Sequence, residues 1–381
     1  MKVGHRRGIL VAGFWAVNAT ACATPYVPPS RLGPQRQEAS WPVYLGTPRH
    51  DACIAESVNA DPRPLWHTSV GRAVRGSPAL GETVIVVGVA DRVVTLVDRA
   101  TGQGLWRARL AGTIHAGPLL DGDRVYVATE ATPDARIYAL RLRDGGTLWS
   151  TKTESIVAPL ALDGDTLYAA TESGTVLRLE TDGGKVTWRR RLAGGGARAA
   201  PIPVGDGIVV ATTADTLYLL ERASGQVRTR LHTPGTMIAA PALDGARLYA
   251  ATTAGRMLAI DFPALTVAWD LPAGDAVLGA PAVAHDTVYA LARNGTLWLV
   301  PKDRPSEARS FALGITATAG PTPVASGVLV ASVSGEVLLV DRRAGTILWR
   351  IELDGPIEQP PLVRDRQLVI VAGRGDIQAY R

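Results

Sequence analysis

Cysteine is almost missing from this sequence: the chain of 381 residues has two, Cys22 and Cys53. Two cysteines cannot supply a disulfide framework, so the fold must rest on packing. They are not adjacent to each other, and neither belongs to a haem-attachment motif. Histidine is also scarce and lacks metal-like spacing, and asparagine occurs three times. We therefore expect no metal site.

The sequence has no excess of one charge once its first residues are set aside. Lysine and arginine number 40 against 35 acidic residues, but Lys2, Arg6 and Arg7 lie in a segment that we expect to be removed. The remaining 37 basic residues nearly balance the 35 acidic ones and form no long basic block. We therefore expect no nucleic-acid partner.

No apolar run is long enough to cross a membrane. The apolar part of the N-terminus, from Gly8 to Ala21, has 14 residues and contains Asn18, whereas a spanning helix needs about 18 or more. A basic start, a short apolar stretch and small residues before Cys22 are typical of an export signal. Residues 1–21 are therefore predicted to be a signal peptide, and the mature protein to be exported.

Cys22 has two interpretations. The small residues before it and the Pro-rich stretch 24–30 after it resemble a bacterial lipoprotein signal with a tether, although Ala19 stands where leucine is usual. The alternative is an ordinary Ala-x-Ala cleavage site that happens to precede a cysteine. We favour lipid attachment at Cys22, with residues 22–61 as a tether and extended arm.

What the sequence has in abundance is a repeat. A proline that follows a small residue and opens an apolar run recurs in steps of 40, 41, 42, 40, 40, 40 and 40 residues, at Pro78, Pro118, Pro159, Pro201, Pro241, Pro281, Pro321 and Pro361. A constant period of this length over most of a chain indicates a stacked or radial array of small units.

Each unit has the pattern of four short strands. Runs such as 84–87 and 93–98 are rich in β-branched residues and are separated by turn residues, often glycine. The fourth run of most units begins near a tryptophan, which we expect to pack between neighbouring units. This column contains Trp106, Trp149, Trp188, Trp269 and Trp349, and it is broken at Thr229 and Phe311.

Two details favour a closed ring. The residue before each marker proline is small or is itself proline, as expected where innermost strands converge on an axis. The last unit ends at Arg381 after three strands, whereas residues 64–70 form a strand without a unit of its own. We therefore predict an all-β, eight-bladed β-propeller over residues 62–381, closed by pairing of this N-terminal strand with the last blade.

The units resemble the PQQ-type repeat of quinoproteins, with its Asp-x-x-x-Gly-x-x-x-Trp core. Residues 98–106 and 341–349 match that core, and residues 41–50 are similar to the segment before the first blade in that family. The repeat occurs in quinoprotein alcohol dehydrogenases, where it implies PQQ, a Ca²⁺ ion and a catalytic aspartate. It also occurs in the outer-membrane assembly lipoprotein BamB, where it implies a scaffold facing the periplasm.

Catalytic motifs are missing: the sequence has no Gly-x-Ser-x-Gly elbow and no phosphate loop. The channel mouth is approximated by the residues three before each marker proline, namely Arg75, His115, Ile156, Arg198, Ile238, Leu278, Thr318 and Glu358. They contain one carboxylate and no set of base, metal ligands and oxyanion donors. Arg75, His115 and Glu358, with Arg198, are interpreted either as a small anion pocket or as a solvated rim.

One basic cluster stands out, consisting of Arg189, Arg190, Arg191 and Arg198. It is either a docking site for an acidic partner or anionic lipid, or a solvated strand and loop. We expect a non-catalytic, lipid-anchored scaffold that resembles BamB, binds protein partners in the cell envelope and needs no cofactor. A PQQ-dependent dehydrogenase and a ligand-sensing propeller outside the cytoplasm remain the alternatives.

Overall fold

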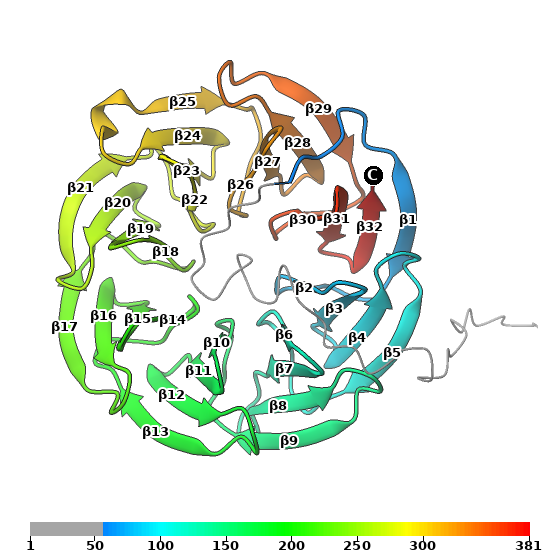
Figure 1. Cartoon of the computed structure of the whole chain (residues 1–381), viewed down its shortest axis with the longest axis vertical. Coiled ribbons are helices and arrows are strands. Elements are labelled where there is room, and N and C mark those ends of the chain that lie inside the picture. The colour runs from blue at the N-terminus through cyan, green and yellow to red at the C-terminus, as the bar shows by residue number, and fades with distance from the viewer. Residues whose placement is uncertain (1–55) are drawn as a thin grey trace, which may run out of the picture.

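The repeat of 40 to 42 residues folds as one four-stranded antiparallel sheet, and eight such sheets stand around a common axis (Figure 1). The protein is described here by a computed structural model that covers residues 56–381. The predicted eight-bladed propeller is therefore confirmed. The predicted signal peptide, Cys22, Cys53 and most of the predicted tether lie outside the described residues.

Each blade runs from an innermost to an outermost strand, in chain order except in the last blade. Blades 1 and 2 consist of β2 (Ala79–Leu80), β3 (Val84–Val89), β4 (Val93–Asp98), β5 (Gly104–Arg109), β6 (Leu119–Asp121), β7 (Arg124–Ala128), β8 (Arg136–Arg141) and β9 (Thr147–Lys152). Blades 3 and 4 consist of β10 (Ala161–Asp163), β11 (Thr166–Ala170), β12 (Thr175–Glu180), β13 (Val186–Arg191), β14 (Ile202–Val204), β15 (Gly207–Thr212), β16 (Thr216–Glu221) and β17 (Val227–His232).

Blades 5 and 6 consist of β18 (Ala242–Asp244), β19 (Arg247–Ala251), β20 (Arg256–Asp261), β21 (Thr266–Pro272), β22 (Ala282–Ala284), β23 (Thr287–Leu291), β24 (Thr296–Pro301) and β25 (Arg309–Ala312). Blades 7 and 8 consist of β26 (Thr322–Val324), β27 (Gly327–Ala331), β28 (Glu336–Val340), β29 (Ile347–Glu352), β30 (Leu362–Arg364), β31 (Gln367–Ala372), β32 (Asp376–Tyr380) and β1 (Pro64–Ser69). A 3₁₀ turn, η2 (Pro305–Glu307), precedes β25. No helix within residues 56–381 is long and apolar enough to cross a membrane.

The ring is closed by pairing of an N-terminal strand with the last blade, as predicted. Strand β1 pairs with β32 in antiparallel register, for example His67 with Gln378 and Ser69 with Asp376. Beyond the strands, Arg63 and Arg381 exchange two main-chain hydrogen bonds of 2.8 Å. Strand β1, from early in the chain, is therefore the outermost strand of blade 8, whose three inner strands come from the C-terminal end.

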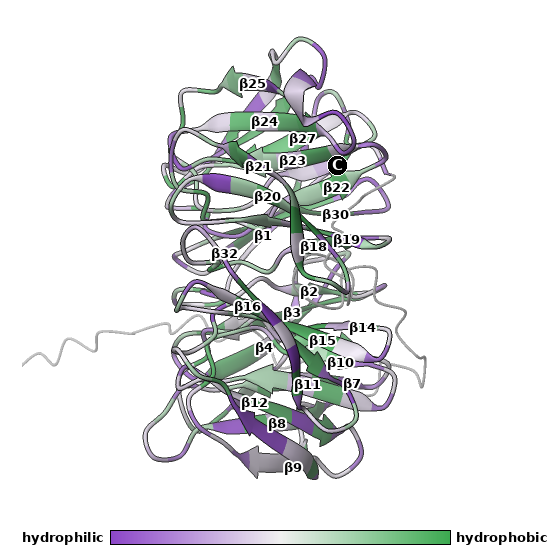
Figure 2. Ribbon diagram, turned by 90° about the vertical axis from the view of Figure 1, so that its left-hand side faces the viewer, coloured by the Kyte–Doolittle hydropathy of each residue, from purple (hydrophilic) through white to green (hydrophobic). Residues whose placement is uncertain are grey.

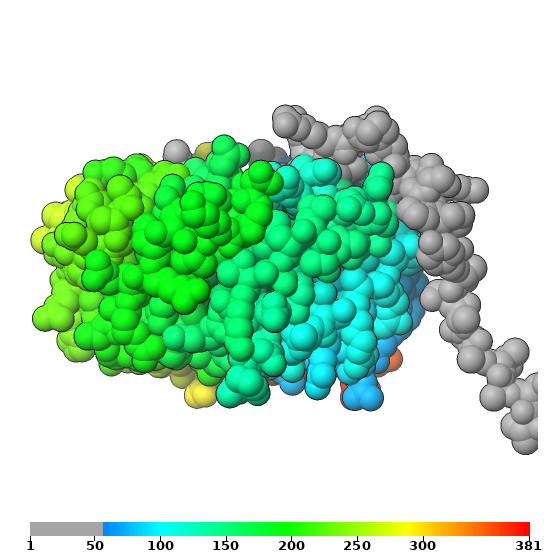
Figure 3. All heavy atoms as spheres, turned by 90° about the horizontal axis from the view of Figure 1, so that it is seen from below, coloured from blue at the N-terminus to red at the C-terminus, as the bar shows by residue number. Residues whose placement is uncertain are grey.

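The hydrophobic core is divided into eight layers, one at each seam between blades. The layer between blades 8 and 1 contains Val369 and Ile377 from one sheet and Ile85 and Val87 from the next. The middle strands are correspondingly coloured as hydrophobic in Figure 2, as for β7 and β15. The side of the ring forms a continuous wall of packed blades (Figure 3). A blade cannot bury its faces alone, so the ring folds as one unit.

The tryptophan column joins neighbouring blades, as predicted. Trp106 on β5 donates its indole N–H to the carbonyl of Leu142 in blade 2 at 2.6 Å, and Trp188 does the same to Arg222 in blade 4 at 3.1 Å. Gly145 lies against the Trp106 ring with a φ of +71°, and a Cβ there would stand 2.8 Å from it. The rings of Trp106 and Trp188 thus pack against a turn of the next blade, where glycine leaves room for them.

Both breaks in this column are compensated. Phe311 has no side-chain N–H, but Arg309 on the same strand donates to the carbonyls of Arg342 and Arg343 in the next blade, at 3.4 and 3.3 Å. Thr229 leaves space at the other break. There Leu265, which is 3% exposed, takes the turn position that glycine has elsewhere.

The innermost strands are as crowded as the small residues before the prolines predict. A Cβ at Gly117 would lie 2.4 Å from the carbonyl oxygen of Ser77 in the neighbouring blade. The corresponding distance from Gly320 to the oxygen of Ala280 is 2.2 Å. Adjacent blades therefore touch through their backbones near the axis.

Candidate functional site

A cavity of about 460 Å³ lies where the connections that lead into the innermost strands meet at the axis. Every blade contributes to its wall. The predicted residues Arg75, His115 and Glu358 all line it, together with Arg198, Ile238, Leu278 and Thr318. Seven of the eight positions expected at the channel mouth therefore lie in this wall.

One position of the wall differs from the prediction. Val157 lines the cavity, whereas Ile156 is fully buried behind it. The main-chain N–H of Ile156 donates to the carbonyl of Thr129, and in the next blade the N–H of Ala197 donates to the carbonyl of Thr171. Ile156 therefore corresponds to Ala197, the residue before Arg198. Pro159 thus stands one residue earlier in its blade than the other marker prolines, and the prediction of Ile156 was wrong for that reason.

An ion pair and a histidine–carboxylate contact occupy one side of the cavity. Arg75 Nη1 lies 3.4 Å from Glu358 Oε2, and Gln359 donates from Nε2 to the Arg75 carbonyl at 2.6 Å. His115 Nδ1 lies 2.5 Å from Glu130 Oε2. Sequence reasoning missed Glu130, because it belongs to the loop between the second and third strands of blade 2 and carries no repeat signal. The charged residues of blades 1, 2 and 8 are thus already partnered.

Arg198 differs from these residues. It is exposed, and the structure gives its guanidinium no hydrogen bond or ion pair with residues 56–381. The side chains nearest along the wall are apolar, from Val157 in blade 3 to Ile238 in blade 5. The cavity therefore combines one unpaired cation with an apolar surface.

This wall does not fit a quinone cofactor with its Ca²⁺ ion. Such a centre needs several converging oxygen ligands, whereas Glu358 is the one carboxylate in the wall and is bound to Arg75. Within residues 56–381, no group of three or more His, Cys, Asp or Glu side chains could hold a metal. Among residues 56–381, the cavity wall also holds no Phe, Tyr or Trp ring on which a planar cofactor could stack.

The predicted basic cluster is divided between two surfaces. Arg189, Arg190 and Arg191 lie on β13, the outermost strand of blade 3, whereas Arg198 lies at the axis. Arg190 faces the next blade and donates to the Gly225 carbonyl at 2.8 Å, and Arg191 lies 3.6 Å from Glu154. Arg189 is exposed, with no ion pair among the described residues. Of the three arginines on β13, it is the one most available to a partner.

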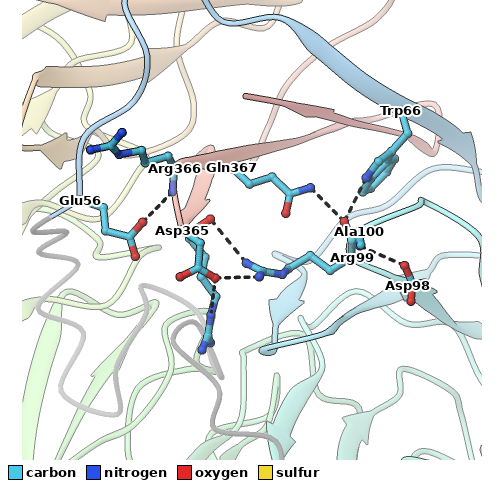
Figure 4. Close-up of polar contacts among 9 residues, drawn as sticks. Glu56, Trp66, Asp98, Arg99, Ala100, Asp365, Arg366 and Gln367 are labelled. Atoms are coloured by element: carbon cyan, nitrogen blue, oxygen red, sulfur yellow. Dashed lines mark hydrogen bonds and ion pairs between the residues drawn. The ribbon is translucent and has the colours of Figure 1, made fainter. Parts of the chain in front are cut away.

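A second polar site lies at the seam between blades 8 and 1 (Figure 4). Arg99, whose side chain is 15% exposed, lies 2.7 Å from Asp365, and its carbonyl accepts hydrogen bonds from Trp66 Nε1 and Gln367 Nε2 at 3.0 and 2.9 Å. The Arg99 guanidinium holds the pKa of Asp365 below its usual value. This network connects the two blades in which the ring closes.

The arm before β1 also contacts this seam. Asp365 and Arg366 form a two-residue hairpin turn in which both residues have positive φ, 51° and 61°. Glu56 accepts the main-chain N–H of Arg366 at 2.8 Å. Glu56, Ser57, Asp365, Arg366 and Arg381 line an open hollow here. At its edge the seam is thus joined by an ion pair and by these hydrogen bonds, and its described residues contain no nucleophile paired with a base.

A family model described as outer membrane protein assembly factor BamB matches residues 53–195, 133–227, 194–303 and 284–381. The outer membrane protein assembly factor BamB of Burkholderia pseudomallei is 24% identical over 352 residues, which cover 84% of this chain and 88% of that protein.

Solved structures share the fold. BamB from Moraxella catarrhalis matches with a TM-score of 0.73 at 15% identity, over 84% of this chain and all of that one. A europium-containing methanol dehydrogenase also matches with a TM-score of 0.73, at 13% identity, over 90% of this chain and 91% of the enzyme. The propeller alone therefore does not separate an assembly factor from an enzyme.

Proposed function

Because this chain belongs to the family of the outer membrane protein assembly factor BamB, we propose that it is a non-catalytic, exported scaffold that helps to assemble outer-membrane proteins. The observation that carries the proposal is similarity over nearly the whole length of such a factor, 88% of the Burkholderia pseudomallei protein. The composition of the axial cavity supports it, because the wall offers a partnered carboxylate and no cofactor ligands.

The proposal includes a location. Residues 1–21 direct export, and Cys22 carries the lipid that holds the protein to the outer membrane, so the propeller meets the membrane only through its tether. A lipid anchor leaves the rigid wall and the loops of the ring free to contact partners in the periplasm. Nucleic acid plays no part.

We place a docking surface for an acidic protein segment around Arg189 on the wall of blade 3. Its guanidinium is exposed, and its neighbour Arg191 is only loosely paired with Glu154, at 3.6 Å. Arginine suits such a surface because its planar guanidinium can bind a carboxylate through two hydrogen bonds.

The test is genetic. Deleting the gene should lower the amount of β-barrel proteins in the outer membrane, and expression of the intact chain should restore it. A chain with Arg189→Glu should restore less and should lose cross-linking to the assembly machinery. Arg109→Glu is the matched control, because Arg109 is an exposed arginine on the outermost strand of blade 1. Normal levels of outer-membrane proteins in the deletion strain would refute the assembly role.

The enzyme alternative has its own measurement. The fold is shared with a methanol dehydrogenase, so purified protein should be titrated with PQQ in the presence of Ca²⁺. We expect no saturable binding, because the wall lacks the oxygen ligands. Stoichiometric uptake of the quinone would replace the scaffold proposal with a catalytic one.

A further inference from the structure

The axial cavity has an uncompensated positive charge on one side. Arg198 enters it from the connection between blades 3 and 4, opposite the Arg75–Glu358 pair of blades 1 and 8. Arg75 and Glu358 neutralise each other, and His115 has Glu130 as its hydrogen-bonding partner. Walls of low dielectric constant strengthen the field of a remaining charge in a concave site. The cavity is therefore electrostatically suited to one negative charge.

Two hydroxyl groups in the same wall lack partners. Ser77, which is 3% exposed, and Thr318 both line the cavity. The Ser77 Oγ and Thr318 Oγ1 atoms are buried and have no hydrogen-bond partner among the described residues. Buried polar atoms in folded proteins nearly always have a partner, so each exception needs an explanation. Here two of them occur in one cavity.

The wall between Arg198 and Thr318, and the position before Arg198 in the ring, are apolar. Val157, Ile238 and Leu278 come from blades 3, 5 and 6, and small residues such as Ala199 and Ala239 fill the space between them. A volume of about 460 Å³ falls within the range of about 300–1,000 Å³ that is typical of small-molecule sites.

We propose that this cavity binds a small monocarboxylate with a short apolar body. Arg198 holds the carboxylate, and the apolar body covers Ile238 and Leu278. The Ser77 and Thr318 hydroxyls, which are buried as they stand, gain a polar partner when their side chains rotate toward the ligand. A dianion is disfavoured, because Arg75 is already paired with Glu358 and a second negative charge would have no cation left to compensate it. This function is separate from docking at Arg189, which lies on the outer wall.

Calorimetric titration of the purified protein with hexanoate tests the proposal. We expect saturable binding of hexanoate. Acetate, which lacks the apolar body, and hexylammonium, which reverses the charge, should each bind at least tenfold more weakly. Arg198→Ala should weaken hexanoate binding at least tenfold and Arg198→Lys less, because lysine keeps the charge but not the fork of donors.

Arg189→Ala is the matched control and should change hexanoate affinity less than twofold. Circular dichroism of each variant establishes that the propeller is intact, as expected for an exposed residue in a connection. Three results would overturn the proposal: no saturable binding by the wild-type protein, equal binding by Arg198→Ala, or equal binding of hexylammonium. None of these results bears on the assembly role, which the deletion strain tests separately.

Discussion

The indole N–H of Trp349 donates a hydrogen bond of 3.1 Å to the carbonyl of Asn59, a residue 290 positions earlier in the chain. In other blades the acceptor is a turn between the third and fourth strands of the next sheet, as for Trp106 and Leu142. Blade 8 has no such turn, because its fourth strand comes from the other end of the chain. In its place, the segment before β1 supplies the acceptor, the Asn59 carbonyl.

The arm should therefore contribute to stability. Val58 is 5% exposed and belongs to the core layer between blades 7 and 8. Val58→Ala should lower the free energy of unfolding by about 1–2 kcal/mol, from lost burial and a residual cavity. The measurement is equilibrium denaturation. Ser57→Ala, at an exposed neighbour, should change stability by less than about 0.5 kcal/mol, and equal effects of the two changes would show that the arm does not stabilise the ring.

Thr229 and Leu265 should behave as a size-matched pair. Thr229→Trp overfills the seam and Leu265→Gly empties it, so each change alone should destabilise the protein by about 1–4 kcal/mol. Together they recreate the tryptophan and glycine of the other seams. The double variant should therefore lose less unfolding free energy than the two single losses added together, by at least about 1 kcal/mol. Denaturation of all four proteins gives this coupling, and strict additivity would contradict it.

Crowding at the axis predicts a large effect of one methyl group. Gly117→Ala would place a Cβ 2.4 Å from the Ser77 oxygen, so neighbouring backbones must separate, and the loss of stability should exceed about 3 kcal/mol. Gly104→Ala is the control, because a Cβ there meets nothing within 4 Å. Thermal unfolding should separate the two variants by several degrees. Similar melting temperatures would mean that the blades can move apart at little cost.

The pair Arg99–Asp365 should make the protein less stable as the pH falls. The pKa of Asp365 is lowered in the folded protein, chiefly by its hydrogen bond with Arg99. The folded state therefore favours the ionised form, and this contribution is complete above the pKa of the unfolded chain, near 3.8, and is lost as pH falls through the lower folded value. Asp365→Asn should remove it while tolerating the positive φ of this turn.

Because Asp365 is largely exposed, the effect should be below about 1 kcal/mol at pH 7. Melting curves between pH 3 and pH 7 should show the difference between wild type and Asp365→Asn shrinking toward the acid end. Asp354→Asn, at an exposed aspartate in the loop after β29, should follow the wild type throughout. A constant difference across the pH range would exclude the ion pair as its cause.

The repeat allowed much of the fold to be predicted from the sequence. A fixed period places each strand, so the eight blades and the pairing of β1 with β32 were predicted and are confirmed. The same reasoning failed at Ile156, because a proline was used as the marker and Pro159 is displaced by one residue. Asn59 as the acceptor of Trp349 could not have been predicted, since it lies outside any repeat unit.

The candidate site was predicted less completely, because position along the chain does not give position across a blade. Arg189 and Arg198 are nine residues apart in the sequence, yet one lies on an outermost strand and the other at the axis. The connection between two blades crosses from the rim of the ring to its centre. Glu130 and the unpartnered hydroxyls depend on side-chain packing between blades, which one sequence does not reveal.

The pairing of β1 with β32 has a consequence for biosynthesis and export. Residues 64–69 are made early but find their partner only when residues 376–380 have been added. A chain that stops early would leave a gap in the ring, with two blade edges exposed to other molecules. Completion of synthesis is thus a physical condition for a sealed particle, and a shortened chain would be a target for proteases in the compartment that receives it.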